Sequence, residues 1–332
     1  MLAFLLTLAA GTPLPPVSGP LTTVPVAALP TAPPPGPAPG SVKVTVLSTM
    51  LTDLKGVGEW GFAALVEVGD RRYLFDTGER PETVLKNAEE LGLDLSTVTD
   101  VILSHHHWDH VGGLLTLRRA MQAKNPQALS RVHVAPGIFQ RRLKEDGSEE
   151  NDMPRIRTEY ERTGGRFIEH AGPAELSPGV WITGPVPRAN NERNWFPGVR
   201  LVTPDGSAED TLPEDQALVV LTSDGPLVIT GCGHAGIVNI MQYAERVAAQ
   251  RSIATVVGGL HLFSAPEQTL AWTAGYMRDA GVRYLLGAHC TGIEAVYRLR
   301  ELAGLDRKRA VVGAVGSSYT SGTGLDPLGL AR

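Results

Sequence analysis

The chain has 332 residues, of which 42% are hydrophobic, and a formal net charge of -5 at pH 7. That length and apolar content suffice for the core of one large α/β domain or of two ordinary ones. No block of lysine or arginine stands out, so the chain lacks the basic surface that binding to nucleic acid or to an anionic membrane requires, and a small-molecule substrate is favoured. Only two cysteines occur, Cys232 and Cys290, and no disulfide framework is expected.

Residues 1–40 differ in composition from the rest. Leu2 to Ala10 form an apolar run with the length of a signal-peptide core, too short for a bilayer span of about 20 residues. Basic residues before the run and a clean cleavage site after it are missing, so export, an uncleaved anchor and a misplaced start codon stay open. The protein is exported or periplasmic in the first case and otherwise cytoplasmic. No stable membrane insertion is expected.

Between Gly11 and Gly40 lie 11 of the 25 prolines of the chain. This density excludes helix and sheet and favours an extended, disordered linker. The sequence therefore predicts one catalytic domain at residues 41–332.

Predicted strands and helices alternate along this domain. In chain order they are a strand at 42–47, a hairpin at 61–68 and 73–75, a helix at 81–91, a strand at 100–103, a helix at 117–124, a strand at 225–230, a helix at 237–250, a strand at 254–257, a helix at 268–280, a strand at 283–286 and a helix at 293–302. Two such halves whose sheets pack together form an αββα four-layer sandwich of the α/β class. Periodicity alone equally permits an open doubly wound sheet.

Four of the nine histidines lie within residues 105–110, directly after a predicted strand. Because alternate residues of an extended turn point the same way, His105 and His107 can converge on one ion while Asp109 and His110 reach a second. Imidazole and carboxylate suit zinc first, with manganese and ferrous iron as alternatives. Two such divalent ions, about 3.5–4 Å apart, can share a bridging hydroxide as nucleophile. A solvated polar loop is the plainer alternative, but the preceding strand and the following glycine pair argue against it.

The stretch from Ser104 to Gly113 resembles the HxHxDH signature of the metallo-β-lactamase-fold superfamily, and Leu74 to Gly78 resembles its first motif. The resemblance implies the αββα sandwich. It also implies that Asp76, at a strand end, orients a ligand histidine without itself binding metal. The simpler interpretation is that Asp76 only begins the turn before Gly78.

A closer resemblance is to one branch, the dihydropterin-ribofuranosylaminobenzene phosphate synthases of methanopterin biosynthesis and related hydrolases. It rests on five stretches: residues 59–61, 215–218, 230–239, 258–262 and 289–292. The branch lacks the separate motif that usually supplies a third histidine, so the resemblance implies that His234 fills that place and that His289 binds the second metal. Cys232 stands where the superfamily usually has its bridging Asp, and is either a thiolate ligand or a small buried residue in a tight turn.

Two further residues are candidates for contacts with the substrate. His261, at another predicted strand end, is a proton donor to the leaving group, a substrate contact or a satisfied core histidine. Thr291 opens a predicted helix whose backbone N–H groups could hold a phosphate or carboxylate, although a plain helix cap is an equal interpretation. His106 and Trp108 should point away from the metals.

The sequence predicts a hydrolase in which a metal-bridging hydroxide attacks a small ester, lactone or phosphoester, with Asp109 and His261 as catalytic residues. The alternative, implied by the resemblance, is a transferase that joins a pterin-methyl group to an aminobenzene ribosyl phosphate. A second alternative is a non-catalytic metal-binding protein on the same fold, against which the complete ligand set argues.

Overall fold

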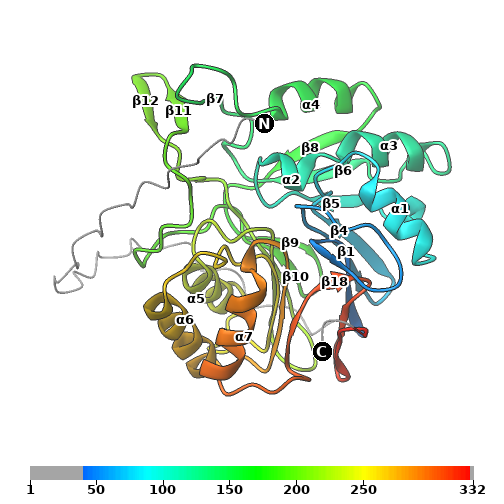
Figure 1. Ribbon diagram of the computed structural model, residues 1–332. Coiled ribbons are helices and arrows are strands. Elements are labelled where there is room, and N and C mark those ends of the chain that lie inside the picture. Colours follow the sequence, from blue (N-terminus) through cyan, green and yellow to red (C-terminus); the bar gives the residue numbers. More distant parts are fainter. Residues whose placement is uncertain (1–39, 330–332) are drawn as a thin grey trace, which may run out of the picture.

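Two large β-sheets pack face to face in the computed structural model, which describes residues 40–329 (Figure 1). Helices cover the outer side of each sheet, so the architecture is the predicted four-layer αββα sandwich, and the open doubly wound alternative is wrong. The apolar run at Leu2 to Ala10 and the proline-rich linker lie outside the described residues and stay predictions. None of the helices within residues 40–329 is long and apolar enough to cross a membrane.

The first sheet has eight strands and comes mostly from the first half of the chain. Its spatial order is β20 (Gly324–Asp326), β19 (Ser318–Thr320), β1 (Val42–Ser48), β3 (Ala63–Val68), β4 (Arg71–Phe75), β5 (Asp100–Ile102), β6 (Arg131–Val134) and β8 (Arg166–Glu169). Its outer face is covered by α1 (Thr83–Glu90), α3 (Leu114–Gln122) and α4 (Met153–Glu161). In Figure 1 these helices lie at the upper right.

The second sheet has seven strands. Its order is β17 (Ala310–Val312), β16 (Tyr284–Gly287), β15 (Thr255–Gly258), β14 (Leu227–Thr230), β13 (Leu218–Val220), β10 (Val180–Ile182) and β9 (Ala174–Ser177). The outer face is covered by α5 (Ile237–Val247), α6 (Glu267–Asp279) and α7 (Ile293–Leu302), which lie at the lower left of Figure 1.

Neighbouring residues of the central strands are buried on opposite faces. In β3, Leu65 packs under the helices while Val66 lies between the sheets, and in β4 Leu74 and Phe75 divide in the same way. Strands buried on both faces read as continuous apolar runs instead of alternating ones. This explains why the hydrophobic pattern of the sequence marked these strands well.

The carboxyl ends of the parallel strands position the candidate site. Strands β4, β5 and β6 are parallel neighbours in the first sheet, and β14, β15, β16 and β17 are parallel neighbours in the second. Loops that leave parallel strands in one direction meet at one edge of a sheet. The motifs of the sequence follow β4, β5, β14, β15 and β16.

Short elements complete the described chain. They are β2 (Leu51–Thr52) paired with β18 (Ala314–Val315), a small sheet of β7 (Arg142–Leu143), β11 (Arg200–Thr203) and β12 (Gly206–Glu209), the short helix α2 (Trp108–Val111), and the 3-10 turns η1 (Leu95–Thr97) and η2 (His289–Thr291).

Arg142 in β7 is a fully buried cation near the edge that carries the histidines. Its guanidinium donates to Asp210 and to Glu214, both at 2.7 Å, and to the backbone oxygens of Gly137 and Gln140. This single arginine therefore compensates the negative charge of two buried carboxylates.

Arg142→Ala is expected to lower the free energy of unfolding by about 3–5 kcal/mol, because it leaves two carboxylates buried without their cation. Arg141→Ala is the matched control, since Arg141 is an exposed neighbour paired with Glu149, and it should cost less than about 1 kcal/mol. Urea unfolding followed by circular dichroism measures both. Equal losses in the two variants would show that burial of Arg142 does not matter.

Candidate metal centre

The residues of the HxHxDH stretch lie at the joint edge of the two sheets. His105 and His107 belong to the loop that follows β5, and Asp109 and His110 lie in the one-turn helix α2. The loop after β14 brings His234 to the same place, and η2 after β16 brings His289.

Three imidazoles form a first group. His105 Nε2 lies 3.0 Å from His107 Nδ1, and the ring of His234 is centred 4.7 Å from that of His105 and 4.9 Å from that of His107. Nδ1 of His234 faces the backbone oxygen of Asn194. Its Nε2 is buried and has no hydrogen-bond partner among residues 40–329, which is costly unless something else binds it.

A second group gathers around Asp109. One of its carboxylate oxygens lies 3.2 Å from His289 Nε2 and 3.7 Å from His110 Nε2. His110 Nε2 also lies 3.1 Å from Cys232 Sγ. Carboxylate, imidazole and sulfur donors thus converge from three separate segments of the chain.

The donor atoms are close enough to surround cations. Within each of two sets all donor atoms lie within 4.8 Å of one another: Asp109, His110, Cys232 and His289 in one, and His105, Cys232 and His234 in the other. A third such set contains His105, His107 and Asp109. Nitrogen, sulfur and carboxylate donors in this number fit divalent transition-metal ions, and the unpartnered Nε2 of His234 points to the same conclusion.

Burial and mutual repulsion keep the first group uncharged. Burial lowers the pKa of His105 well below its usual value, and the neighbouring His110 and His107 lower it further. The pKa values of His107 and His234 are lowered well below the usual value for the same two reasons. Neutral imidazole is the form that binds metals.

The second group favours positive charge. Burial lowers the pKa of His110, but the carboxylates of Asp109 and Asp76 outweigh burial and raise it to about 9. Burial raises the pKa of Asp109, but His110 and His289 outweigh it and leave that pKa well below the ordinary range. Asp109 is therefore a carboxylate, a form that can bind a cation.

Asp76 joins the ends of β4 and β5. One carboxylate oxygen accepts from the backbone N–H of Ser104 at 2.7 Å, and the other accepts from the Ser104 hydroxyl and lies 2.7 Å from His110 Nδ1. His110 Nε2 consequently faces the centre. This is the geometry that orientation of a ligand histidine by Asp76 requires.

Strained backbone concentrates at these loop positions. Asp76, His261 and His289 have φ angles of 54°, 51° and 48°, in the left-handed region that side chains other than glycine rarely adopt. Each such residue costs of order 1–3 kcal/mol, and strain of this kind clusters at functional sites.

His106 points away from the centre, as the sequence predicted. Its two ring nitrogens lie 2.7 Å from Glu214 and 2.9 Å from Glu150. Glu214 also accepts from Arg142. His106, Glu150, Glu214 and Arg142 thus form a largely buried polar layer next to the histidine loop. No local pattern predicts this layer, because His106 and Glu214 are 108 residues apart along the chain.

Residues 215–218 and 59–61, two of the stretches on which the resemblance rests, hold loops in place. Asp215 accepts from the backbone N–H of Ala235 at 2.7 Å, and Gln216 donates to the backbone oxygen of Leu103 at 2.8 Å. They tie the loop after β14 to the end of β5. Glu59 is buried and accepts from Ser48 and from the backbone N–H groups of residues 79 and 80.

Exposed aromatic side chains surround the donor groups, and the sequence analysis missed them. Trp60 is 44% exposed and its ring is centred 4.9 Å from that of His289, while Phe263, 43% exposed, lies 5.9 Å from Trp60. Phe196 and Phe263 each lie 5.4 Å from the ring of His261. We call Trp60, Phe196 and Phe263 the aromatic rim.

His261 lies between the rim and the first group. Its ring is centred 4.6 Å from that of His234, and its Nδ1 has no hydrogen-bond partner in the described part of the chain. The predicted alternative of a satisfied core histidine is not what the geometry shows.

Thr291 does not face the centre. Its side chain is fully buried, and its hydroxyl donates to the Gly258 backbone oxygen and accepts from the Leu260 N–H, both at 3.0 Å. The N–H groups of Thr291 and Gly292 donate to Ala288 and His289. The predicted anion contact at Thr291 is therefore not supported, because these groups are already used to close the turn.

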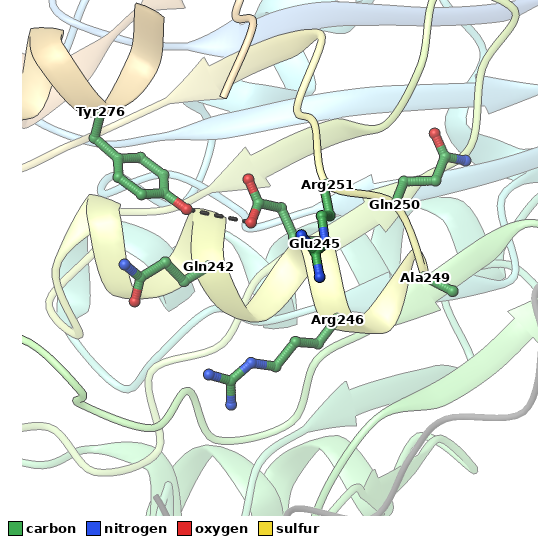
Figure 2. A pocket seen from close by; sticks show the side chains of 7 residues that line it. All are labelled: Gln242, Glu245, Arg246, Ala249, Gln250, Arg251 and Tyr276. Atoms are coloured by element: carbon green, nitrogen blue, oxygen red, sulfur yellow. Dashed lines mark hydrogen bonds between the residues drawn. The ribbon is translucent and has the colours of Figure 1, made fainter. Parts of the chain in front are cut away.

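A hollow of about 570 Å³ lies on the outer layer between α5 and α6. Figure 2 shows its lining, in which Tyr276 donates to Glu245 at 3.2 Å beside Gln242 and Arg246. No histidine or cysteine lines it, so it is separate from the donor groups.

Residues 61–244 match the sequence profile of the family described as the metallo-beta-lactamase superfamily. The chain belongs to this superfamily. The match includes the histidine loop and extends through the loop after β14.

Similar proteins extend this assignment. The chain is 26% identical, over 274 residues, to a 7,8-dihydropterin-6-methyl-4-(beta-D-ribofuranosyl)-aminobenzene-5'-phosphate synthase of Methanocaldococcus jannaschii, covering 77% of this chain and 90% of that protein. The resemblance to that branch is thereby confirmed.

Solved structures agree. Tm1679, a metal-dependent hydrolase of the beta-lactamase superfamily, is 27% identical with a TM-score of 0.67, covering 83% of this chain and 98% of that one. The metallo-beta-lactamase fold protein YhfI from Bacillus subtilis, 13% identical with a TM-score of 0.55, covers 85% of this chain and 100% of that one and shares the fold.

Asp76→Asn should weaken zinc binding about 10–100-fold, because the amide cannot hold His110 as the carboxylate does. Asparagine tolerates the left-handed backbone at this position, so the fold should survive. Competition with a chromogenic chelator measures the affinity. Asp146→Asn, in an exposed turn, is the control, and an equal loss there would remove the special role of Asp76.

Proposed function

We propose that this protein is a metal-dependent hydrolase that holds two divalent cations and cleaves a small ester, lactone or phosphoester. The observation that carries the proposal is the convergence of uncharged, buried imidazole nitrogens, above all the unpartnered Nε2 of His234, with a carboxylate and a sulfur. A merely structural polar cluster would satisfy its nitrogens internally.

In this proposal three histidines hold the first cation and two histidines with Asp109 hold the second. The first set is His105, His107 and His234, and the second is Asp109, His110 and His289. Cys232 belongs to the grouping with Asp109, His110 and His289 and also to the grouping with His105 and His234, so it is the side chain that the two cations would share. It occupies the position of the bridging Asp to which the superfamily resemblance points.

Bound cations of this kind supply an activated water near neutral pH and polarise the scissile group. The remaining work falls to the chain. Asp76 holds His110 in place, and His261, beside the first group and open to solvent in part, can hold a proton for the leaving group. The exposed aromatic rim offers surface for an apolar or planar part of the substrate.

Zinc is the cation that fits the donors best. Imidazole suits zinc and iron, whereas manganese prefers oxygen-rich sets, and the six proposed ligands include one carboxylate, that of Asp109. A thiol donor moves the preference further toward zinc.

His107→Ala and Asp109→Asn should each yield a folded protein that holds clearly less metal than the wild type, because each removes one donor from a set of three or four. Elemental analysis of purified protein gives the stoichiometry. His170→Ala, a histidine that stacks on His133 away from the centre, is the control and should keep its metal. Unchanged metal content in both first variants would refute the ligand assignment.

A panel of phosphodiesters, lactones, simple esters and β-lactams should identify one class that the zinc-loaded protein cleaves. Chelation of the metal should abolish that cleavage, and added zinc should restore it. Cleavage that persists in the His107→Ala variant, or that survives chelation, would contradict the proposal.

The synthase-like relative favours a second candidate, a transferase that joins a pterin-methyl group to an aminobenzene ribosyl phosphate. Its similarity covers 90% of the relative, and the aromatic rim could stack on planar rings. Pyrophosphate released only when pterin and aminobenzene substrates are both present would establish the transferase. A zinc-loaded protein inactive in both assays would leave the third candidate, a non-catalytic metal-binding protein.

A further inference from the structure

The only two cysteines of the chain meet at the metal centre. Cys232 Sγ and Cys290 Sγ lie 3.2 Å apart, and both thiols are free. Cys232 comes from the loop after β14 and Cys290 from the turn after β16, and the strand β15 lies between these two strands in the sheet. Nothing in the local sequence brings them together, because 58 residues separate them.

Two glycines at the end of β15 make the meeting possible. A Cβ atom on Gly259 would lie 2.8 Å from Cys290 Sγ and 2.2 Å from the backbone oxygen of Gly231. A Cβ atom on Gly258 would lie 2.0 Å from the backbone oxygen of Thr230, and its φ of +120° suits glycine. Any side chain here would push apart the two loops that carry the sulfurs.

The distance is short for two separate thiols and close to what a bond needs. A disulfide has an S–S length of about 2.05 Å, so the sulfurs must approach by roughly a further 1.2 Å. Both thiols are almost fully buried, while Asp109 beside them is partly exposed. The partly exposed Asp109 side therefore offers the shortest approach, and we expect a small oxidant to reach the thiols more readily than a large one.

We propose that Cys232 and Cys290 are a modification site at which a peroxide forms an internal disulfide. One thiol attacks the peroxide, whose O–O bond breaks to give a sulfenic acid and one water. The second thiol then attacks that sulfur, which forms the S–S bond and releases a second water. Two sulfurs are oxidised, one peroxide is reduced, and the two thiol protons leave in the two waters.

The bond would remove from the centre the Cys232 donor, which the grouping with Asp109, His110 and His289 shares with the grouping of His105 and His234. That consequence rests on the proposed function, whereas the bond itself does not. Reduction by a dithiol would restore the thiols and with them the metal site. The centre would then respond to oxidation through its own ligand.

The test begins with metal-free, fully reduced protein treated with hydrogen peroxide at a low molar ratio. Alkylation under denaturing conditions should count two thiols before treatment and none after it. Intact mass should fall by two hydrogen atoms, and a peptide that links Cys232 to Cys290 should appear. Dithiothreitol should return both thiols. Oxygen addition without the linked peptide, or a bond between two chains, would overturn the proposal.

Measurements of zinc binding distinguish failure of the disulfide proposal from failure of the proposed function. Oxidised wild type should bind zinc at least tenfold more weakly than reduced wild type, with recovery after dithiothreitol. Cys290→Ala, which keeps Cys232, should form no cross-link and should gain oxygen instead. If the linked peptide forms but reduced protein binds no zinc, the metal proposal fails and the thiol pair stands. The mass of the wild type decides the matter even if the variant does not fold.

Discussion

Crowding of buried imidazoles is the constraint on which the rest of this structure depends. His105, His107 and His234 lie so close together that burial and mutual repulsion hold their pKa values well below the usual value and favour the neutral form. The Nε2 of His234 has no hydrogen-bond partner among residues 40–329, which is costly inside a protein, and a cation is a ligand that can satisfy several neutral imidazole nitrogens at once. Next to these histidines, the carboxylates of Asp109 and Asp76 raise the pKa of His110 and so favour a positive charge at that position.

The fold could be predicted because its signal is local. Apolar runs marked β4, β5, β14, β15 and β16, and periodic apolar residues marked α5, α6 and α7 with ends within a few residues of those observed. The choice between a sandwich and an open sheet came from the motif resemblance, since both arrangements bury the same strands. The ion pairs of Arg142 in the small sheet were not predicted. Its partners Asp210 and Glu214 lie 68 and 72 residues farther along the chain, and no periodic pattern encodes such pairs.

For the site, too, residues close together in the sequence could be predicted from their spacing, whereas residues from distant segments could not. Spacing alone brought His105, His107, Asp109 and His110 to one turn, whereas His234 and His289 were placed through resemblance, and the structure brings all six together. The anion contact predicted at Thr291 stays a prediction, although the N–H groups of Thr291 and Gly292 already donate within the turn. The aromatic rim went unnoticed because its members come from three separate loops, and only folding shows that they share one edge.

The donor groups and the aromatic rim contribute differently to the choice of reaction and substrate. The donors are buried, held by second hydrogen bonds and partly strained, so their geometry is set by the fold and is compatible with several reactions. The aromatic rim is exposed, lies on loops and touches His261 and His289 directly. Loops tolerate change that the sandwich does not. A solved structure with 13% identity shares the fold, and one fold can support many activities. Under the proposed function, Trp60, Phe196 and Phe263 are the exposed aromatic side chains in ring contact with His261 or His289 or with one another, so we expect them to take part in selecting the substrate.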